Sequence, residues 1–506
     1  MITLIKGAQA QAAIAADTQR ILTLLAMVLR PHEPIRTTTA WLNFMRGAEE
    51  IINYQFALSP GLFSRVCAYT FLSSETRLDD LADRIEQELT EGAADRFHLV
   101  FSVLRQLSFP DSYESDDPDD VWQLPDRLMF GLQAIEFLAH HRRHFVALSH
   151  TLPQACEGSE AIDERTLLMK LVIFAEQIGP ACVALASAQM LSHADPDFHV
   201  ELEDGRLEVP TKYQTAMHNT LEPESLGIGD IAAEGDDSPG FAAQLKARDS
   251  FLDVDPRLVF SEPELLNQIV DIRAAYSEFD LAGTTFDAAA TLIAALMTQC
   301  QDHYWVKLRP DKLEQLALQA GVAKRAGPML VAPPRTFIQH MNTYQPFWRV
   351  GDDLVATIPS LMRFIYTLRD TVLGKQRRYQ IRAGFIFERA VKKILEEHGF
   401  TILAAKRIQR KEFDVIAIDR EGGLVHFQVK NNRLDLTMIE DNPILYARHC
   451  RRLLRYYERA LRKEEGREHL LLERFGHQSV KHYVVSKFPI PTDDPRILSL
   501  AQLHLV

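Results

Sequence analysis

The stretch 384–430 constrains the fold of this chain most, because it places polar residues where a folded core needs apolar ones. Its sequence is GFIFERAVKKILEEHGFTILAAKRIQRKEFDVIAIDREGGLVHFQVK. Glu388 lies on the apolar side of a predicted helix, since Val391 and Leu395 share its three- and four-residue spacing. A buried carboxylate needs a partner that offsets its desolvation. Glu388 is therefore a candidate functional residue.

Two predicted strands follow this helix, and each carries further polar residues. Asp414 is embedded in EFDVIAID, a run rich in β-branched residues that is typical of a core strand. Gln428 and Lys430 end the strand LVHFQVK, and their two-residue spacing places both on one face. With Glu388 these residues supply two acids, an amide and a lysine, the combination that a divalent-metal hydrolytic site requires.

The order helix-Glu, strand-Asp, then Gln-x-Lys resembles the PD-(D/E)XK nuclease superfamily. Within it, the pattern is similar to the Mrr-type restriction endonuclease branch, in which Gln replaces the usual acidic residue before x-Lys. The Gly-x-x-Phe-Glu run at Gly384, Phe387 and Glu388 also matches that branch, and Gly399 closes the helix. The resemblance covers roughly residues 376–490.

The resemblance implies a role for each polar residue. Asp414 is the expected direct ligand of Mg²⁺, and the backbone carbonyl of Val429 adds another; Glu388 binds the metal directly or through water. Mn²⁺ is expected to substitute. Lys430 orients the attacking water and offsets developing negative charge. Gln428 is neutral, so the site has one negative charge fewer than an acidic version.

A purely structural explanation stays open for the same residues. Asp414 and Lys430 on neighbouring strands would then form an ordinary buried ion pair, with Glu388 nearby. His426 shares the face of Gln428 and Lys430, but a lone histidine on a strand is more often structural than catalytic.

Charge is distributed unevenly along the chain. Its net charge is −13, yet residues 371–506 contain 26 Lys and Arg against 17 Asp and Glu, or +9, which leaves −22 for residues 1–370. The basic part contains the nuclease-like motif, as expected if only this part contacts phosphates. A predicted helix within it carries Arg448, Arg451, Arg452, Arg455 and Arg459. We expect these arginines to contact nucleic-acid phosphates; the alternative is a solvated helix paired with its own glutamates.

Length and patterning predict a multidomain chain, with a mostly α-helical N-terminal region and a C-terminal α/β domain. The predicted segments are 1–240 (helical), 241–370 (helical, with a short hairpin at Gly351 and Asp352) and 371–506. The last should form a restriction-endonuclease-like mixed sheet flanked by helices. Its predicted elements are a helix at 376–398, strands at 400–409, 411–419 and 424–430, a helix at 443–465, a strand at 480–486 and a short helix or strand at 496–506.

Several conspicuous stretches favour ordinary explanations. The run HHRRH at 140–144 is expected to be a solvated helix face, since adjacent histidines point in different directions. The acidic stretch 109–126 fits no EF-hand spacing and is expected to be a solvated loop. The apolar stretch 166–191 contains Lys170, Glu176 and Pro180, so we expect core helices and no membrane contact.

These features together predict a cytoplasmic, Mg²⁺-dependent DNA endonuclease in restriction or antiviral defence. Scattered cysteines favour the reducing cytoplasm. The helical region is expected to sense, gate or form a homo-oligomer. There are two alternatives: a repair or recombination nuclease, and a regulatory protein that binds nucleic acid without cleaving it. The sequence leaves RNA open as a substrate.

Overall fold

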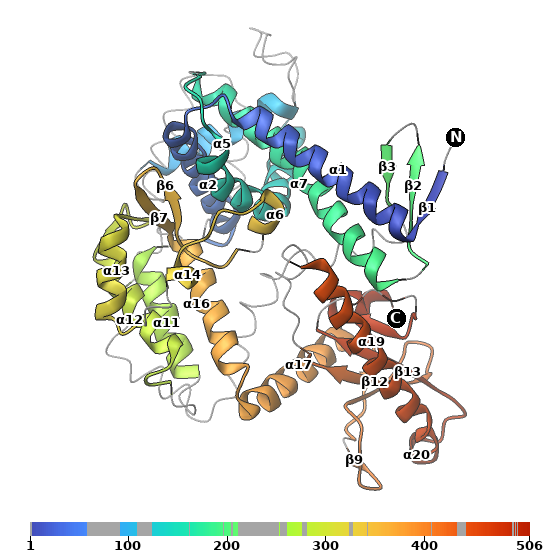
Figure 1. Cartoon of the computed structure of the whole chain (residues 1–506). Coiled ribbons are helices and arrows are strands. Elements are labelled where there is room, and N and C mark those ends of the chain that lie inside the picture. Colours follow the sequence, from blue (N-terminus) through green and yellow to red (C-terminus); the bar gives the residue numbers. More distant parts are fainter. Residues whose placement is uncertain are drawn as a thin grey trace. The chain divides into compact units, whose positions relative to one another are not determined.

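The computed structural model describes residues 3–57, 92–108, 124–210, 252–253, 261–275, 281–432 and 442–505, with short gaps inside these ranges. Helices dominate the chain before residue 377, and the C-terminal part combines helices with a mixed five-stranded sheet (Figure 1). A helical N-terminal region followed by an α/β region is what the sequence predicts. The acidic stretch 109–126 lies almost wholly outside the described residues.

The chain divides into two compact units that each combine separate segments. The first unit contains Met1–Gln19, Val183–Lys246 and Arg369–Val506, and the second contains Arg20–Cys182 and Ala247–Leu368. The division next to residue 370 lies beside the predicted boundary, whereas the other divisions differ from the three consecutive segments expected from the sequence.

Long helices build the second unit around aromatic side chains. Trp41 and Phe44 pack on Phe145, and the Trp41 indole donates a hydrogen bond to the Phe145 carbonyl oxygen at 3.1 Å. The Trp41 ring is therefore packed against apolar groups, and its N–H has a hydrogen-bond partner, as a buried tryptophan needs. The helices are α2 (Pro34–Ala57), α5 (Ala93–Ser108) and α6 (Leu124–Ala155), with parts of α1 (Gly7–Leu29) and α7 (Glu164–Ala194).

The expectation of a solvated HHRRH face is wrong. His141, Arg143 and His144 of α6 are buried. The helix packs against α2, where Arg142 donates to the buried Glu49 carboxylate at 2.7 Å. Burial lowers the pKa of His144 to about 3, so this imidazole is neutral at physiological pH. Sequence spacing could not reveal that α6 is covered on several sides.

A four-stranded antiparallel sheet completes the second unit, in the order β4-β5-β7-β6. The predicted hairpin is confirmed, and Gly351 between β6 and β7 has a φ of +61°, which favours glycine. The strands β4 and β5 were not predicted. The strands are β4 (Cys300–Gln301), β5 (Trp305–Leu308), β6 (Trp348–Val350) and β7 (Asp353–Thr357). The accompanying helices are α11 (Glu262–Ala275), α12 (Thr285–Met297), α13 (Pro310–Gln319), α14 (Gly327–Leu330), α15 (Phe337–His340) and α16 (Ile358–Leu373).

The C-terminal sheet has the order β14-β13-β12-β11-β8. Strand β12 pairs antiparallel with β11 and parallel with β13, so the sheet is mixed as predicted. Each of the predicted strands 400–409 and 411–419 is divided into two short strands, with breaks at 403–406 and at 413–414. Gln409 and Arg410 form the turn between β9 and β10 with positive φ. The helices are α17 (Arg377–Glu397), α19 (Pro443–Glu465) and α20 (Glu468–Phe475). The strands are β8 (Thr401–Ile402), β9 (Arg407–Ile408), β10 (Lys411–Glu412), β11 (Val415–Ile418), β12 (Leu424–Lys430), β13 (Val480–Ser486) and β14 (Ile497–Ser499), followed by the short helix η3 (Leu500–Leu505).

The two faces of this sheet are covered by different helices. Val425 and Phe427 of β12 pack with Val391 of α17 on one face. Leu424 of β12 packs with Leu471 of α20 on the other. Because side chains alternate along a strand, Gln428 and Lys430 share the face of Leu424.

A small antiparallel sheet in the first unit joins distant parts of the sequence. Strand β2 (His199–Glu203) pairs with both β1 (Thr3–Lys6) and β3 (Arg206–Glu208). Residues 211–240, which follow β3, lie outside the described residues.

Two described helices, α1 and α7, are long and apolar enough to cross a membrane by length and composition alone. In α7, 56% of the apolar window is buried, as in a core helix; in α1 the share is 22%. Core helices of soluble proteins pass the same length and composition test, so the absence of membrane contact and the cytoplasmic location stay predictions.

Candidate active site

Asp414 lies at the point where β11 begins, and β12 supplies its hydrogen-bond donors. The Gln428 side-chain amide donates to Asp414 Oδ2. The Val429 backbone N–H donates to the same oxygen at 2.8 Å. The register of the two strands explains this contact. Strand β12 continues past the first residue of β11, so the Val429 N–H has no backbone partner on β11, and the Asp414 side chain accepts its hydrogen bond instead.

The backbone of Val429 also supplies an oxygen on this side of the strand. In an extended strand the N–H and C=O of one residue point to the same neighbour. Since the Val429 N–H points to Asp414, its carbonyl oxygen points to the same edge.

Lys430 extends the site along the same face as Gln428. Its ammonium lies 5.8 Å from the centroid of the Tyr456 ring on α19. Burial lowers the pKa of Lys430, and the charges of Asp414 and Glu464 oppose that shift. Among the described interactions, Lys430 forms no ion pair with Asp414, so the site differs from the simple ion pair that the structural explanation requires.

Asp414 is held in an electrostatically unfavourable position for a carboxylate. Burial raises its pKa, while the Lys430 charge and the Val429 N–H lower it; the Glu388 charge raises it further. A carboxylate in such a place is stabilised by any cation that approaches.

Glu388 is buried, as the helical spacing predicts, and comes from α17 on the opposite face of the sheet. Its carboxylate accepts a hydrogen bond from Lys392 Nζ at 2.8 Å, one helical turn further on. Its charge acts on Asp414. The structure therefore joins Asp414, Gln428 and Val429 by hydrogen bonds. It places Lys430 on the same face of β12 as Gln428, and Lys430 and Glu388 act on Asp414 through their charges.

A further set of charged groups, not predicted from the sequence, acts on Lys430: the Glu464 charge raises the pKa of its ammonium and the Arg467 charge lowers it. The Glu464 carboxylate is only 1% exposed and accepts two hydrogen bonds from Arg467, each at 2.6 Å. His426 is fully buried, with its Nδ1 3.2 Å from His482 Nδ1 and 3.9 Å from Glu464 Oε2. The His426 contacts agree with the structural role that its strand position favours. The signal for Glu464 is its spacing from Leu461 and Tyr457, which continues the buried stripe of α19.

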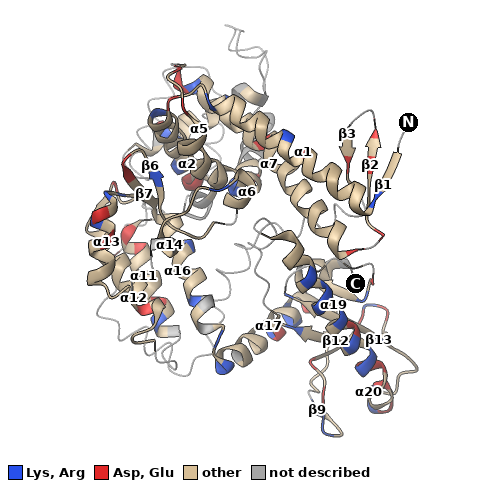
Figure 2. Ribbon diagram, in the orientation of Figure 1, with Lys and Arg blue, Asp and Glu red and all other residues tan. Residues whose placement is uncertain are grey.

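The basic helix α19 exposes all five predicted arginines. Figure 2 shows Lys and Arg gathered along this helix. In the described part of the chain none of the five pairs with a carboxylate; Arg452 contacts His449 Nδ1 at 2.7 Å and Arg459 donates to the Arg455 carbonyl oxygen at 3.1 Å. Leu453, Tyr457 and Leu461 are buried as expected, whereas Tyr456 is 45% exposed. The arginines are thus accessible to phosphates and are not paired with the glutamates of their own helix.

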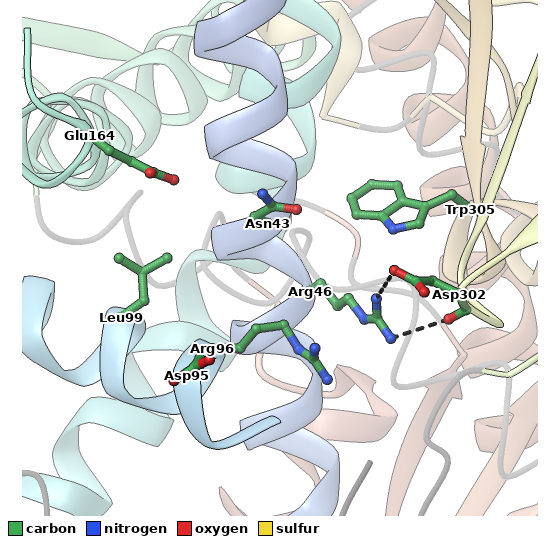
Figure 3. A pocket seen from close by; sticks show the side chains of 8 residues that line it. All are labelled: Asn43, Arg46, Asp95, Arg96, Leu99, Glu164, Asp302 and Trp305. Carbon is green, nitrogen blue, oxygen red and sulfur yellow. Dashed lines mark hydrogen bonds and ion pairs between the residues drawn. The ribbon is translucent and has the colours of Figure 1, made fainter. Parts of the chain in front are cut away.

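A separate cavity of about 270 Å³ lies in the second unit (Figure 3). Its two arginines are already engaged: Arg46 contacts Asp302, and Arg96 donates twice to the buried Glu50 carboxylate. None of the predicted site residues lines it. Its lining is Asn43, Arg46, Asp95, Arg96, Leu99, Glu164, Asp302 and Trp305.

No family model, no curated protein and no solved structure matches this chain. The candidate site therefore stands on the residues and their geometry.

The donor set at Asp414 fits a hard cation. Within the described residues, no group of three or more His, Cys, Asp and Glu side chains is arranged to hold a metal ion. Mg²⁺ does not require one, because it is commonly bound by one or two carboxylates with water and substrate phosphate. Asp414, the Val429 carbonyl and the charge of Glu388 supply oxygen donors and negative charge of that kind.

Proposed function

We propose that this chain is a metal-dependent endonuclease that hydrolyses phosphodiester bonds of DNA at Asp414 and Lys430. The observation that carries the proposal is the junction of β11 and β12. There a half-buried carboxylate is fixed by Gln428 and Val429, and a lysine follows on the same face. These are the strand positions of the PD-(D/E)XK pattern that the sequence resembles, so a restriction-endonuclease-like domain is part of the proposal.

Each residue of the site has a defined task in this proposal. Asp414, the Val429 carbonyl and Glu388 would hold Mg²⁺ or Mn²⁺, which when bound supplies a Lewis acid for the phosphate and lowers the pKa of water. Gln428 fixes the Asp414 side chain by hydrogen bonding to Oδ2, and the second carboxylate oxygen, Oδ1, would bind the metal ion. Lys430 orients water and compensates the negative charge that develops on the phosphate.

The surroundings of the site favour a polyanionic substrate. The exposed arginines of α19 lie on the helix that contacts Lys430 through Tyr456. Arginines of this kind bind phosphates and position a strand without reading its sequence. The resembled branch suggests DNA as substrate and restriction or antiviral defence as role, in the cytoplasm, with the helical region as a sensing or oligomerisation part.

Incubation of the purified chain with nucleic acid tests this proposal. The substrates are plasmid, linear duplex, branched and single-stranded DNA, modified and unmodified, and RNA of matched sequence, each with Mg²⁺, Mn²⁺ or EDTA. We expect cleavage with either metal and none with EDTA. Binding without cleavage under all conditions would favour the regulatory alternative, and selective cleavage of branched DNA would favour the repair alternative.

A further inference from the structure

Tyr456 is an aromatic residue in an unusual environment for its helix. The other two tyrosines of α19, Tyr446 and Tyr457, are buried in the domain, whereas Tyr456 is 45% exposed. Its ring is tilted against Tyr457, with 5.8 Å between centroids, so one side is supported by the domain. Large aromatic rings are usually buried, so a ring that stays accessible beside a charged site is a candidate contact for a ligand.

The location of Tyr456 relates it to the proposed reaction. Its ring centroid lies 5.8 Å from Lys430 Nζ, the group proposed to compensate charge on the cleaved phosphate. On α19, Arg452 lies one turn before it and Arg459 one turn after it, and both are exposed. An accessible ring thus lies between two accessible cations, next to the proposed catalytic lysine.

This combination is the one by which proteins hold single nucleic-acid strands. Cations follow the phosphates, and an aromatic ring stacks on a base with little dependence on sequence. In a duplex the faces of a base are covered by its neighbours, and only its edges are presented in the grooves. Stacking on Tyr456 therefore needs a base that is unpaired or turned out of the helix.

We propose that Tyr456 stacks on an unpaired base of the strand held at Lys430, and that the substrate is single-stranded at the point of cleavage. This inference rests on the proposed function, because it assigns the strand at Lys430 to the reaction. Arg452 and Arg459 would contact the phosphates on either side of that base. Tyr456 is then a positioning residue that fixes the nucleotide relative to Lys430.

Binding measurements on the full chain in EDTA test the stacking without cleavage. The probes are oligo(dT) and a duplex of the same length, and the variants are Tyr456→Ala, Tyr456→Phe and, as a control, Phe385→Ala, which removes another half-exposed aromatic ring. We expect Tyr456→Ala to weaken oligo(dT) binding about fivefold to a hundredfold, with Tyr456→Phe close to the parent. Duplex binding, which depends on phosphates, should change less than about twofold.

Photo-crosslinking provides a readout that a structural role would not produce. Oligo(dT) with one iodouracil is irradiated on the protein, and mass spectrometry should find the crosslink on the peptide that contains Tyr456. Unchanged oligo(dT) affinity of Tyr456→Ala, with the crosslink elsewhere, would overturn the inference. An equal loss for both probes together with a lower melting temperature would also overturn it, since Tyr456 would then only support the fold.

The cleavage assay separates this inference from the proposed function. Mg²⁺-dependent cleavage by a protein whose oligo(dT) binding is indifferent to Tyr456 refutes the stacking alone. Tyr456-dependent binding and crosslinking without any metal-dependent cleavage supports the stacking and refutes the hydrolytic function.

Discussion

At the residue scale, the central feature is a carboxylate that two donors hold at the edge of a strand pair. The Asp414 side chain takes hydrogen bonds from Gln428 and from the Val429 N–H, and burial raises its pKa. Removing water from a carboxylate is costly unless hydrogen bonds or charge compensate it. The neutral amide of Gln428 matters here, because an acidic side chain in its place would repel Asp414 until a cation arrived.

Gln428→Glu tests this arrangement through stability. The substitution keeps nearly the same shape but replaces a hydrogen bond to Asp414 with repulsion between two carboxylates. We expect a lower melting temperature than the parent in EDTA, a larger rise when Mg²⁺ is added, and cleavage retained at least in part. The measurement is a thermal melt of both proteins with and without Mg²⁺, beside a cleavage time course. A variant that is destabilised and gains nothing from Mg²⁺ would contradict a metal site at this position.

His144 gives a pH-dependent prediction in the second unit. Its pKa is lowered from 6.5 to about 3 by burial, so the unfolded chain binds this proton at a higher pH than the folded protein does. Above pH 6.5 this difference does not reduce the free energy of unfolding. As the pH falls from 6.5 toward about 3, protonation of His144 in the unfolded chain lowers the free energy of unfolding by up to about 1.4 kcal/mol per pH unit.

Urea unfolding at about pH 7 and about pH 5 measures this effect for the parent and His144→Gln. The parent should lose more stability between the two pH values than the variant does, because the variant lacks this buried imidazole. Equal losses would mean that His144 is not the neutral, buried group described above. Each protein is compared with itself at the two pH values, so any loss of stability that the substitution causes at both pH values cancels.

Sequence reasoning identified the polar residues of the site but not their partners. The two-residue spacing of Gln428 and Lys430 fixes their common face in any strand. The hydrogen bond from Gln428 to Asp414 depends on the register of β11 and β12, which the sequence does not state. The exposure of Tyr456 and the burial of Glu464 depend on how α19 is rotated against the sheet, and only packing decides that rotation.

At the element scale, α19 combines a buried stripe with an exposed basic surface. Cys450, Leu453, Tyr457 and Leu461 form the buried side, and the arginines lie outside it. Helix α17 and strands β12 and β13 were predicted close to their observed bounds, because their periodicities are long and regular. Strands β8 to β11 were not resolved from sequence, because short strands around a tight turn leave little pattern.

The basic surface of α19 predicts a loss of DNA binding on substitution. Replacing Arg451, Arg455 and Arg459 together by alanine should weaken DNA binding. If each arginine contacts one phosphate, the slope of the logarithm of the binding constant against the logarithm of the salt concentration should fall in magnitude by about three. The matched control replaces Arg407, Arg410 and Lys411, three exposed basic residues of the β9–β10 hairpin. A salt titration of affinity, with melting curves of each variant, gives the result. Unchanged affinity for the α19 variant would make this helix an ordinary solvated surface.

At the scale of the whole molecule, the basic C-terminal part has its own core. Every residue of its two hydrophobic clusters and every strand of its sheet comes from residues 387–503. The division into units nevertheless adds Met1–Gln19 and Val183–Lys246 to this part. Sequence composition located the basic segment, but it could not predict that Met1–Gln19 and Val183–Lys246 belong to the same unit. These two segments pair with each other through β1 and β2, a contact between residues far apart in the sequence.

The fragment 371–506 is expected to fold by itself, since it contains the whole sheet and both clusters. It should unfold cooperatively and bind DNA in low salt, with affinity falling steeply as salt is added. Circular dichroism during urea unfolding and a salt titration of binding test this. A fragment without a cooperative transition would show that Met1–Gln19 or Val183–Lys246 completes its core.

The most direct test of the central claim is the rate of Mg²⁺-dependent DNA cleavage by site variants and matched controls. Asp414→Asn removes the main ligand charge, and Lys430→Ala removes the charge next to it. Each should reduce the rate by on the order of a hundredfold or more while the protein stays folded. The controls Glu397→Gln and Lys393→Ala change an exposed carboxylate and an exposed lysine of α17, and both should cleave like the parent. Cleavage by Asp414→Asn and Lys430→Ala at the parental rate would contradict the account.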